Sequence, residues 1–226
     1  YQEVEVVCRA TSPHDQVTLQ YLAMAGDFQR EYLVRLPLPL AQLYSRAPNA
    51  PAARARHAYP FYLFEALIKL AACPQVAAYL NEVDRGAERV ESLDHLLAQL
   101  ALPSLGQWVA ILRELARHHG NRPDAASHPL GHVWQQLNEK RGKSPAMADL
   151  FRRIKNGPDG KSAGDQSCSL LQLIDALVLY RNSVFGHGAA RFESFYENEM
   201  GPLLFPAASE VLAEGVLDML GPKGSR

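Results

Sequence analysis

The sequence predicts an all-α fold, a bundle of helices with several additional short helices and little or no β-sheet. Most of the chain is rich in Ala, Leu, Glu, Gln and Arg, which favour helix, and its apolar residues recur three and four positions apart. Only residues 3–8 alternate as a short strand would, and nothing nearby offers a convincing pairing partner. With 226 residues, 47% of them hydrophobic, the chain can bury a substantial core.

Two prolines and two serines set the expected helix boundaries. Pro60 marks the true start or a kink of a long helix, and Pro74 ends it before a short turn of helix resumes to Leu80. Ser104 caps the best-delimited helix, whereas Ser167 or Ser169 caps a strongly apolar one. The expected helices cover residues 14–27, a short stretch within 36–47, and residues 52–72, 88–100, 105–119, 128–142, 144–156, 170–185, 190–199 and 206–220.

We expect one helical domain over residues 1–226. Its parts are an N-terminal extension with the first helices (1–50), central helices (51–155), a flexible Gly-rich polar loop (156–166), and a segment carrying the last helices (167–220). Because the chain starts at Tyr1 without Met, we expect it to be a fragment, the N-terminal part of a longer protein.

Charge and cysteine content indicate which cellular compartment and which kinds of partner to expect. Lys and Arg number 23 against 24 for Asp and Glu, so the net charge of -1 gives no global attraction to nucleic acid or to a membrane. Cys8, Cys73 and Cys168 lie far apart, as buried thiols in a reducing compartment do. The chain starts with no signal-peptide pattern, and no window approaches the roughly 18 consecutive apolar residues of a membrane helix. We therefore expect a cytoplasmic protein without membrane contact.

The segment with the most chemical information is Arg181–Gly188, at the end of the predicted helix 170–185. Arg181 and Asn182 follow a run of apolar residues, and His187 lies between two glycines. Six residues on a helix separate Arg181 from His187 by about 9 Å of rise and about 120°, so the two converge only if the last turn loosens. Gly186 and Gly188 give that freedom. An unpaired Arg is costly to bury, so a cationic notch is expected here.

This Arg-Asn-x4-His string resembles the R-x(4–6)-H motif of the HEPN superfamily, over roughly residues 165–200. The resemblance implies a HEPN-like helical bundle that forms a homodimer with two motifs across a cleft, and many members are metal-independent endoribonucleases. For this chain it implies that His187 exchanges a proton with the ribose 2′-OH or the leaving 5′-oxygen. Arg181 would hold the scissile phosphate, and Asn182 would orient one of these groups. Glu65 is the position we assign to an acidic partner of the motif Arg.

A structural interpretation of the same residues stays open. An Arg-Asn pair at a helix end also anchors neighbouring helices, with His187 capping the terminal carbonyls. Many members of the superfamily keep the fold and serve as non-catalytic binding or dimerisation units.

A basic stretch from Lys140 to Lys161 lies next to the motif in the sequence. It holds seven Lys and Arg residues against two Asp, which suits an RNA backbone but is also common on a solvated face. The candidate RNA or phosphate contacts are Arg152, Arg153, Lys155 and Lys161.

Two further groups have weaker chemical meaning. His128 and His132 are four apart, with His118 and His119 nearby, but Pro129 and Gly131 interrupt the helix and no Cys or carboxylate stands at a ligand-like spacing, so no metal and no cofactor is expected. The aromatic residues Tyr59, Phe61, Tyr62 and Phe64 indicate a helix–helix interface, within the chain or between two copies.

Two functions follow. The first is a non-catalytic, HEPN-like module that dimerises or senses a ligand for a downstream effector domain of a larger bacterial signalling or defence protein. The second is a metal-independent endoribonuclease with Arg181, Asn182 and His187 at a homodimer cleft and RNA as its substrate.

Overall fold

A computed structural model describes residues 28–141, 145–157, 167–185 and 191–213. The predicted strand at 3–8, the predicted helix at 14–27, Lys161 and His187 lie outside the described residues. Within these ranges nearly all regular structure is helical, so the all-α prediction is confirmed.

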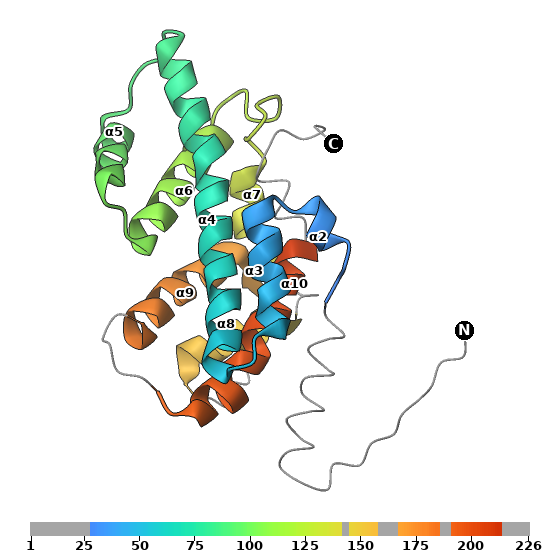
Figure 1. Cartoon of the computed structure of the whole chain (residues 1–226). Coiled ribbons are helices and arrows are strands. Elements are labelled where there is room, and N and C mark those ends of the chain that lie inside the picture. Colours follow the sequence, from blue (N-terminus) through green and yellow to red (C-terminus); the bar gives the residue numbers. More distant parts are fainter. Residues whose placement is uncertain (1–27, 142–144, 158–166, 186–190, 214–226) are drawn as a thin grey trace, which may run out of the picture.

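The helices follow one another with short connections (Figure 1). In chain order they are α2 (Tyr32–Arg35), α3 (Leu38–Asn49), α4 (Ala53–Asp84), α5 (Glu91–Ala98), the 3₁₀ turn η1 (Gln99–Ala101), α6 (Leu105–Gly120), α7 (Val133–Asn138), α8 (Pro145–Asn156), α9 (Leu170–Val184), the π-helical turn η2 (Phe195–Met200) and α10 (Gly201–Ala213). The two-residue strands β1 (Lys140–Arg141) and β2 (Cys168–Ser169) pair antiparallel, and they bring the start of α9 next to the end of α7.

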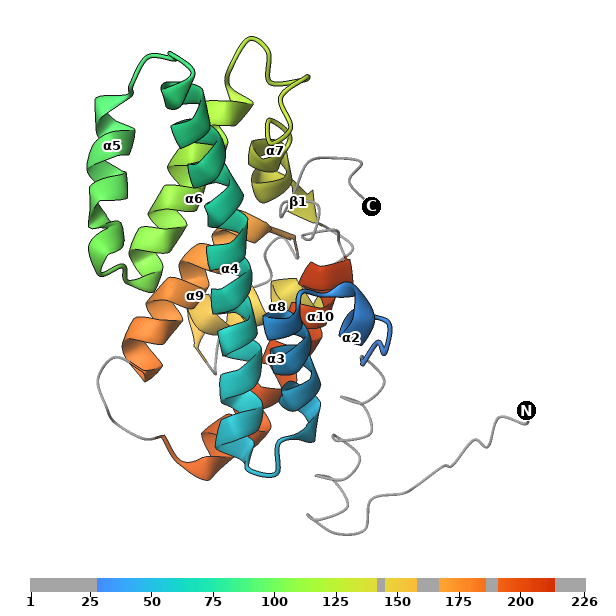
Figure 2. The same ribbon diagram turned by 45° about the horizontal axis from the view of Figure 1, so that its top comes forward.

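The long helix α4 is the central element. Figure 1 shows α3 and α10 beside the first half of α4, and α6 beside it from about the middle of α4 towards its end. The turn η2 also contacts α4. Figure 2 shows α5 and α6 side by side at one end of α4, with α8 and α10 nearer the other. Helix α9 contacts α6, α7 and α8, so it connects the helices at one end of α4 with α8 nearer the other end.

Pro60 does not mark the start of α4 and Pro74 does not end it, because one helix runs through both prolines. Each proline removes one backbone hydrogen bond and strains the preceding turn. Burial outweighs this cost: Pro60 itself is buried, and apolar side chains are covered along most of the helix. Tertiary packing, which the sequence pattern does not display, sets the length of α4.

Three other boundaries differ from the prediction. The helix expected at 88–100 begins at Glu91, and the one expected at 128–142 is reduced to α7 because residues 121–132 form turns. Helix α10 begins at Gly201 rather than at residue 206, because it continues directly from η2. In contrast, Ser104 forms the predicted N-cap in a capping box with Gln107. Of the two serines considered for the apolar helix, Ser169 rather than Ser167 is the cap, in a capping box with Gln172.

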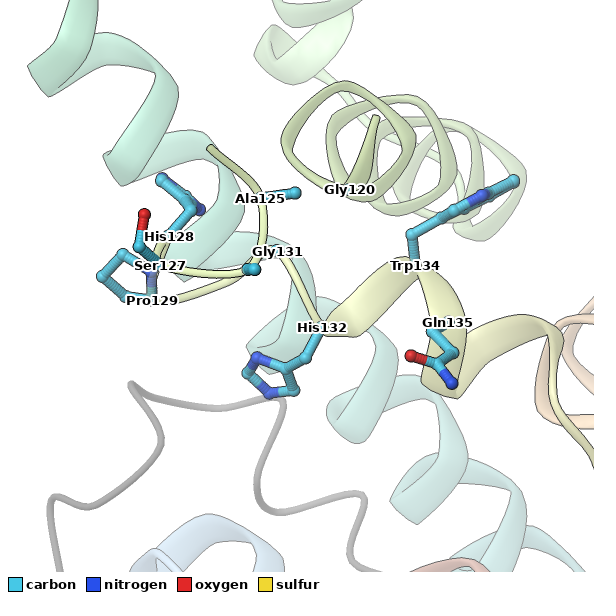
Figure 3. A pocket seen from close by; sticks show the side chains of 10 residues that line it. Gly120, Ala125, Ser127, His128, Pro129, Gly131, His132, Trp134 and Gln135 are labelled. Atoms are coloured by element: carbon cyan, nitrogen blue, oxygen red, sulfur yellow. The ribbon is translucent and has the colours of Figure 1, made fainter. Parts of the chain in front are cut away.

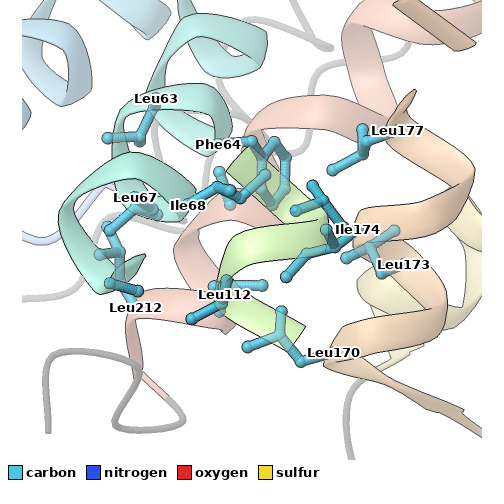
Figure 4. Packing of buried hydrophobic residues seen from close by; sticks show 14 of the residues in the cluster. Leu63, Phe64, Leu67, Ile68, Leu112, Leu170, Leu173, Ile174, Leu177 and Leu212 are labelled. Carbon is cyan, nitrogen blue, oxygen red and sulfur yellow. The ribbon is translucent and has the colours of Figure 1, made fainter. Parts of the chain in front are cut away.

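The core lies where α4, α6, α9 and α10 meet. Figure 4 shows Phe64 and Ile68 of α4 facing Leu112 of α6, with Ile174 of α9 and Leu212 of α10 completing the cluster. Each of these side chains is at most 3% exposed. Trp108 and Trp134 are partly buried and pack against the core.

Two features of the structure concern the predictions of buried cysteines and of no membrane contact. Cys168 is buried as predicted, but Cys73 is exposed, because its position on α4 faces solvent rather than a neighbouring helix. Helix α4 is also long and apolar enough to cross a membrane by length and composition alone, a property that it shares with core helices of soluble proteins.

Candidate functional site

The end of α9 carries the part of the motif that the structure describes. The capping box at Ser169 fixes where the helix starts, and its apolar face is buried as far as Tyr180. Arg181 is half-buried and Asn182 is exposed on the next positions. The Arg181 carbonyl accepts a hydrogen bond from the Phe185 amide at 2.8 Å, so the helix is still regular at the motif.

The structure brings Arg181 and Asn182 together on the last turn of α9, whereas His187 lies outside the described residues. Within the described part of the chain, the Arg181 guanidinium forms no ion pair. Glu65, which we assigned as the acidic partner of Arg181, instead forms an ion pair within α4, with 2.8 Å between its Oε1 atom and Lys69 Nζ. The Arg181 side chain is therefore available to bind an anion.

Next to the motif lies a buried polar pair that the sequence did not predict. His57 of α4 and Tyr180 of α9 form a hydrogen bond of 2.5 Å between Nε2 and the phenol oxygen. His57 is fully buried, and burial, with a smaller effect from Arg54, lowers its pKa to about 4. Burial also raises the pKa of Tyr180, so both groups are neutral near pH 7.

Aromatic rings enclose this pair. Phe185 stacks on His57 with ring centroids 5.5 Å apart, and Tyr196 of η2 meets the imidazole edge-on at 4.9 Å. Phe61 contacts both Tyr180 and Phe185. Part of the predicted aromatic interface is thus internal, joining α4 to α9 and η2, whereas Tyr62 remains 44% exposed. Aromatic residues of α4 and of η2 therefore surround the last turn of α9.

A cavity of about 420 Å³ opens between α8, the last turn of α9 and the segment 191–200. Its wall is mostly apolar, and Phe195 and Met200 belong to it. The Tyr180 and Ser183 residues of α9 also line it, as does Arg191, whose guanidinium lies 5.8 Å from the centre of the Phe195 ring. Such a wall, apolar with a few polar groups, is typical of a site for a small organic ligand.

The predicted RNA-binding residues are largely engaged within the chain. Arg152 pairs with Asp149, and Arg153, which also lines the cavity, pairs with Glu199 of η2. Lys155 is exposed and Lys161 lies outside the described residues. The carboxylates offset much of the positive charge that the sequence places on α8, so this helix offers phosphates less attraction than its composition suggests.

A second cluster of functional groups lies at the other end of α4. Glu82, His119 and His128 each offer one ligand atom, and these atoms lie within 4.8 Å of one another, close enough to hold a metal ion. No metal was expected from the sequence, because no Cys or carboxylate stands near these histidines at a ligand-like spacing. Glu82 is 37 residues before His119 along the chain, so only the packing of α4 against α6 shows the group.

A pocket of about 560 Å³ adjoins this cluster, and both His128 and His132 line it. Figure 3 shows the two imidazoles projecting from different parts of the turn segment in different directions. His128 instead stacks on His119, with ring centroids 4.7 Å apart and planes 12° from parallel. The four-residue spacing of His128 and His132 therefore does not make them a ligand pair, because the segment between them is not helical.

Comparison with known proteins adds no relative to these observations. The chain matches no protein-family model, and neither the curated proteins nor the solved structures include a significant match.

Proposed function

We propose that this chain is a non-catalytic, HEPN-like helical module that senses a small ligand and relays its presence to a partner. The observation that carries the proposal is the cavity of about 420 Å³ beside the last turn of α9. Its apolar wall fits a largely apolar ligand, and Arg191, which has no ion pair with another described residue, suits an acidic group on that ligand.

The position of the cavity supports a sensing role. Helix α8, helix α9 and the segment leading into α10 all contribute to its wall, so a ligand there touches three elements at once. The buried His57–Tyr180 pair connects the same turn of α9 to α4. We further propose that the responding partner is a second copy of the chain in the cytoplasm, or an effector domain of the same polypeptide.

A fluorescent anionic probe, 1-anilinonaphthalene-8-sulfonate, tests the cavity. We expect saturable fluorescence enhancement with the wild type and its loss in Ser183→Trp, because the indole would fill the space that Ser183 lines. Leu179→Trp is the matched control, since Leu179 is 56% exposed on the same helix and does not line the cavity. Equal probe binding by both variants would overturn the proposal for this cavity. Sedimentation velocity with and without the probe measures whether occupancy changes dimerisation.

The alternative function is a metal-independent endoribonuclease. It is favoured by one specific observation, the location of Arg181 and Asn182 on a regular last turn with the Arg181 guanidinium unpaired within the described residues. If this function holds, wild-type protein cleaves labelled single-stranded RNA in the presence of EDTA and leaves a 2′,3′-cyclic phosphate. Arg181→Ala and His187→Ala would abolish cleavage, and Arg85→Ala, an exposed Arg beyond the end of α4, would not. Absence of cleavage by the folded wild type would reject the nuclease and leave the sensing proposal in place.

A further inference from the structure

We propose that Glu82, His119 and His128 form a binding site for a divalent transition-metal ion, with Zn²⁺ as the best-suited ion. The site joins three elements, because Glu82 lies near the end of α4, His119 near the end of α6, and His128 in the turns that follow α6. Two imidazoles and one carboxylate are a common zinc ligand set, and it leaves one coordination position open.

His119 already has the bonding pattern of a metal ligand. Its Nε2 lies 3.2 Å from the Gln75 carbonyl oxygen, which can only accept, so Nε2 carries the proton and donates it. The lone pair is then on Nδ1, which is buried and has no hydrogen-bond partner among the described residues. Histidine ligands in metal sites commonly donate their other N–H to a backbone carbonyl in this way.

An unpaired buried nitrogen needs an explanation, because a buried polar atom without a partner loses its hydrogen bond to water and destabilises the fold. His119 is fully buried, so bulk water does not reach its ring. The imidazole with its proton on Nε2 and its lone pair on Nδ1 is the form that binds metal. A metal ion would satisfy the Nδ1 lone pair.

Glu82 and His128 have nearly the spacing that a shared ion requires. The Glu82 Oε1 and His128 Nε2 atoms lie 2.9 Å apart, and two ligand atoms about 2.0–2.1 Å from one tetrahedral zinc lie about 3.3 Å apart. The second Glu82 oxygen pairs with Arg122, which also pairs with Asp124. Glu82 can therefore bind a metal through Oε1 while Arg122 holds its other oxygen, and Asp124 offsets the arginine charge.

Metal binding at His128 requires two local changes. The lone pair of each nitrogen lies in the plane of its ring, so the His128 imidazole has to turn out of its near-parallel stack on His119, and its proton has to move. The His128 Nδ1 atom accepts a hydrogen bond from the Leu130 amide at 3.2 Å, so Nε2 carries the proton that is donated to Glu82. A metal at Nε2 requires that proton to move to Nδ1, which ends the bond from Leu130. His128 also lines the pocket of about 560 Å³, so the site lies next to it (Figure 3).

Zinc titration of the metal-free full chain tests the site. By isothermal titration calorimetry we expect one Zn²⁺ per chain, and at least tenfold weaker binding in Glu82→Gln and in His128→Gln. Neither side chain is fully buried, so these variants are expected to fold, which far-UV circular dichroism checks. His132→Gln is the matched control: it removes the other imidazole of the same pocket and should leave zinc affinity unchanged.

Two further measurements make the outcome decisive. Co²⁺ in place of Zn²⁺ should give intense visible d–d absorption in the wild type and lose it in Glu82→Gln, and hydrogen exchange at the Leu130 amide should accelerate when Zn²⁺ binds. Zinc affinity that survives in both Glu82→Gln and His128→Gln, or no binding by the folded wild type, would overturn the proposal. In either case the three residues serve only as an ion-pair and stacking network.

Discussion

At the scale of the single residue, His57 has the clearest consequence for stability. Its pKa in the folded protein is about 4, below the ordinary value of 6.5, because the neutral ring is buried. As the pH falls from 6.5 towards 4, the unfolded chain gains a proton at this position that the folded chain does not. The free energy of unfolding therefore decreases through this window, by about 2 kcal/mol between pH 7 and pH 5.

Urea unfolding at pH 7 and pH 5 measures this contribution. The double variant His57→Phe/Tyr180→Phe removes both members of the buried pair, so no partner is left unpaired, and it should lose about 2 kcal/mol less than the wild type between the two pH values. His95→Gln removes an exposed histidine of α5 and should keep the wild-type pH dependence. A double variant with the same pH dependence as the wild type would show that other groups cause it.

At the scale of the element, the capping box of α9 determines where the motif helix begins. The Ser169 Oγ accepts a hydrogen bond from the Gln172 amide at 3.2 Å, and the Gln172 side chain accepts one from the Ser169 amide at 2.9 Å. We expect Ser169→Ala to lower the free energy of unfolding by about 1–2 kcal/mol, because it leaves a helix N–H without its acceptor. Chemical denaturation measures the change. Ser194→Ala is the control, because Ser194 precedes η2 without a side-chain cap, and an equal loss there would contradict the capping argument.

Helix ends of this kind are the part of the fold that the sequence predicts best. A cap is a local interaction between residues three positions apart, so Ser104 could be identified from its neighbours alone, and the second cap could be narrowed to Ser167 or Ser169. The path of α4 through Pro60 and Pro74 could not, because it depends on burial by helices that are distant in the sequence. Patterns among neighbouring residues therefore predict where most helices lie along the chain, whereas tertiary packing determines how long each helix is.

At the scale of the whole molecule, the junction of α4, α6, α9 and α10 determines stability. Leu112 is 1% exposed at this junction and borders an apolar void of about 20 Å³. We expect Leu112→Ala to cost about 2–5 kcal/mol of unfolding free energy, because the truncation enlarges a space that is already not filled. Leu102→Ala, at a residue that is 92% exposed, should change stability by less than about 0.5 kcal/mol in the same thermal or urea unfolding experiment. A small effect at Leu112 would mean that the four helices repack around the deletion.

The candidate sites show the limit of sequence reasoning at this scale. Arg181 and Asn182 were identifiable because they are adjacent in the chain and interrupt an apolar run. The His57–Tyr180 pair spans 123 positions, and Glu82 is separated from His128 by 46, so no local spacing marks either group. The dense aromatic residues near the start of α4 were a partial signal for the buried His57–Tyr180 pair. The four histidines between positions 118 and 132 were a partial signal for the cluster that contains Glu82 and His128.

The central position of α4 also has a consequence for synthesis on the ribosome. This helix is complete at Asp84, but α10, which covers part of it, follows roughly 130 residues later. At about 5–20 residues per second, the part of its apolar surface that α10 covers stays exposed for roughly ten seconds. During that interval the nascent chain exposes a segment with the length and composition of a membrane span, and chaperones that bind exposed apolar segments would have their longest contact with it there.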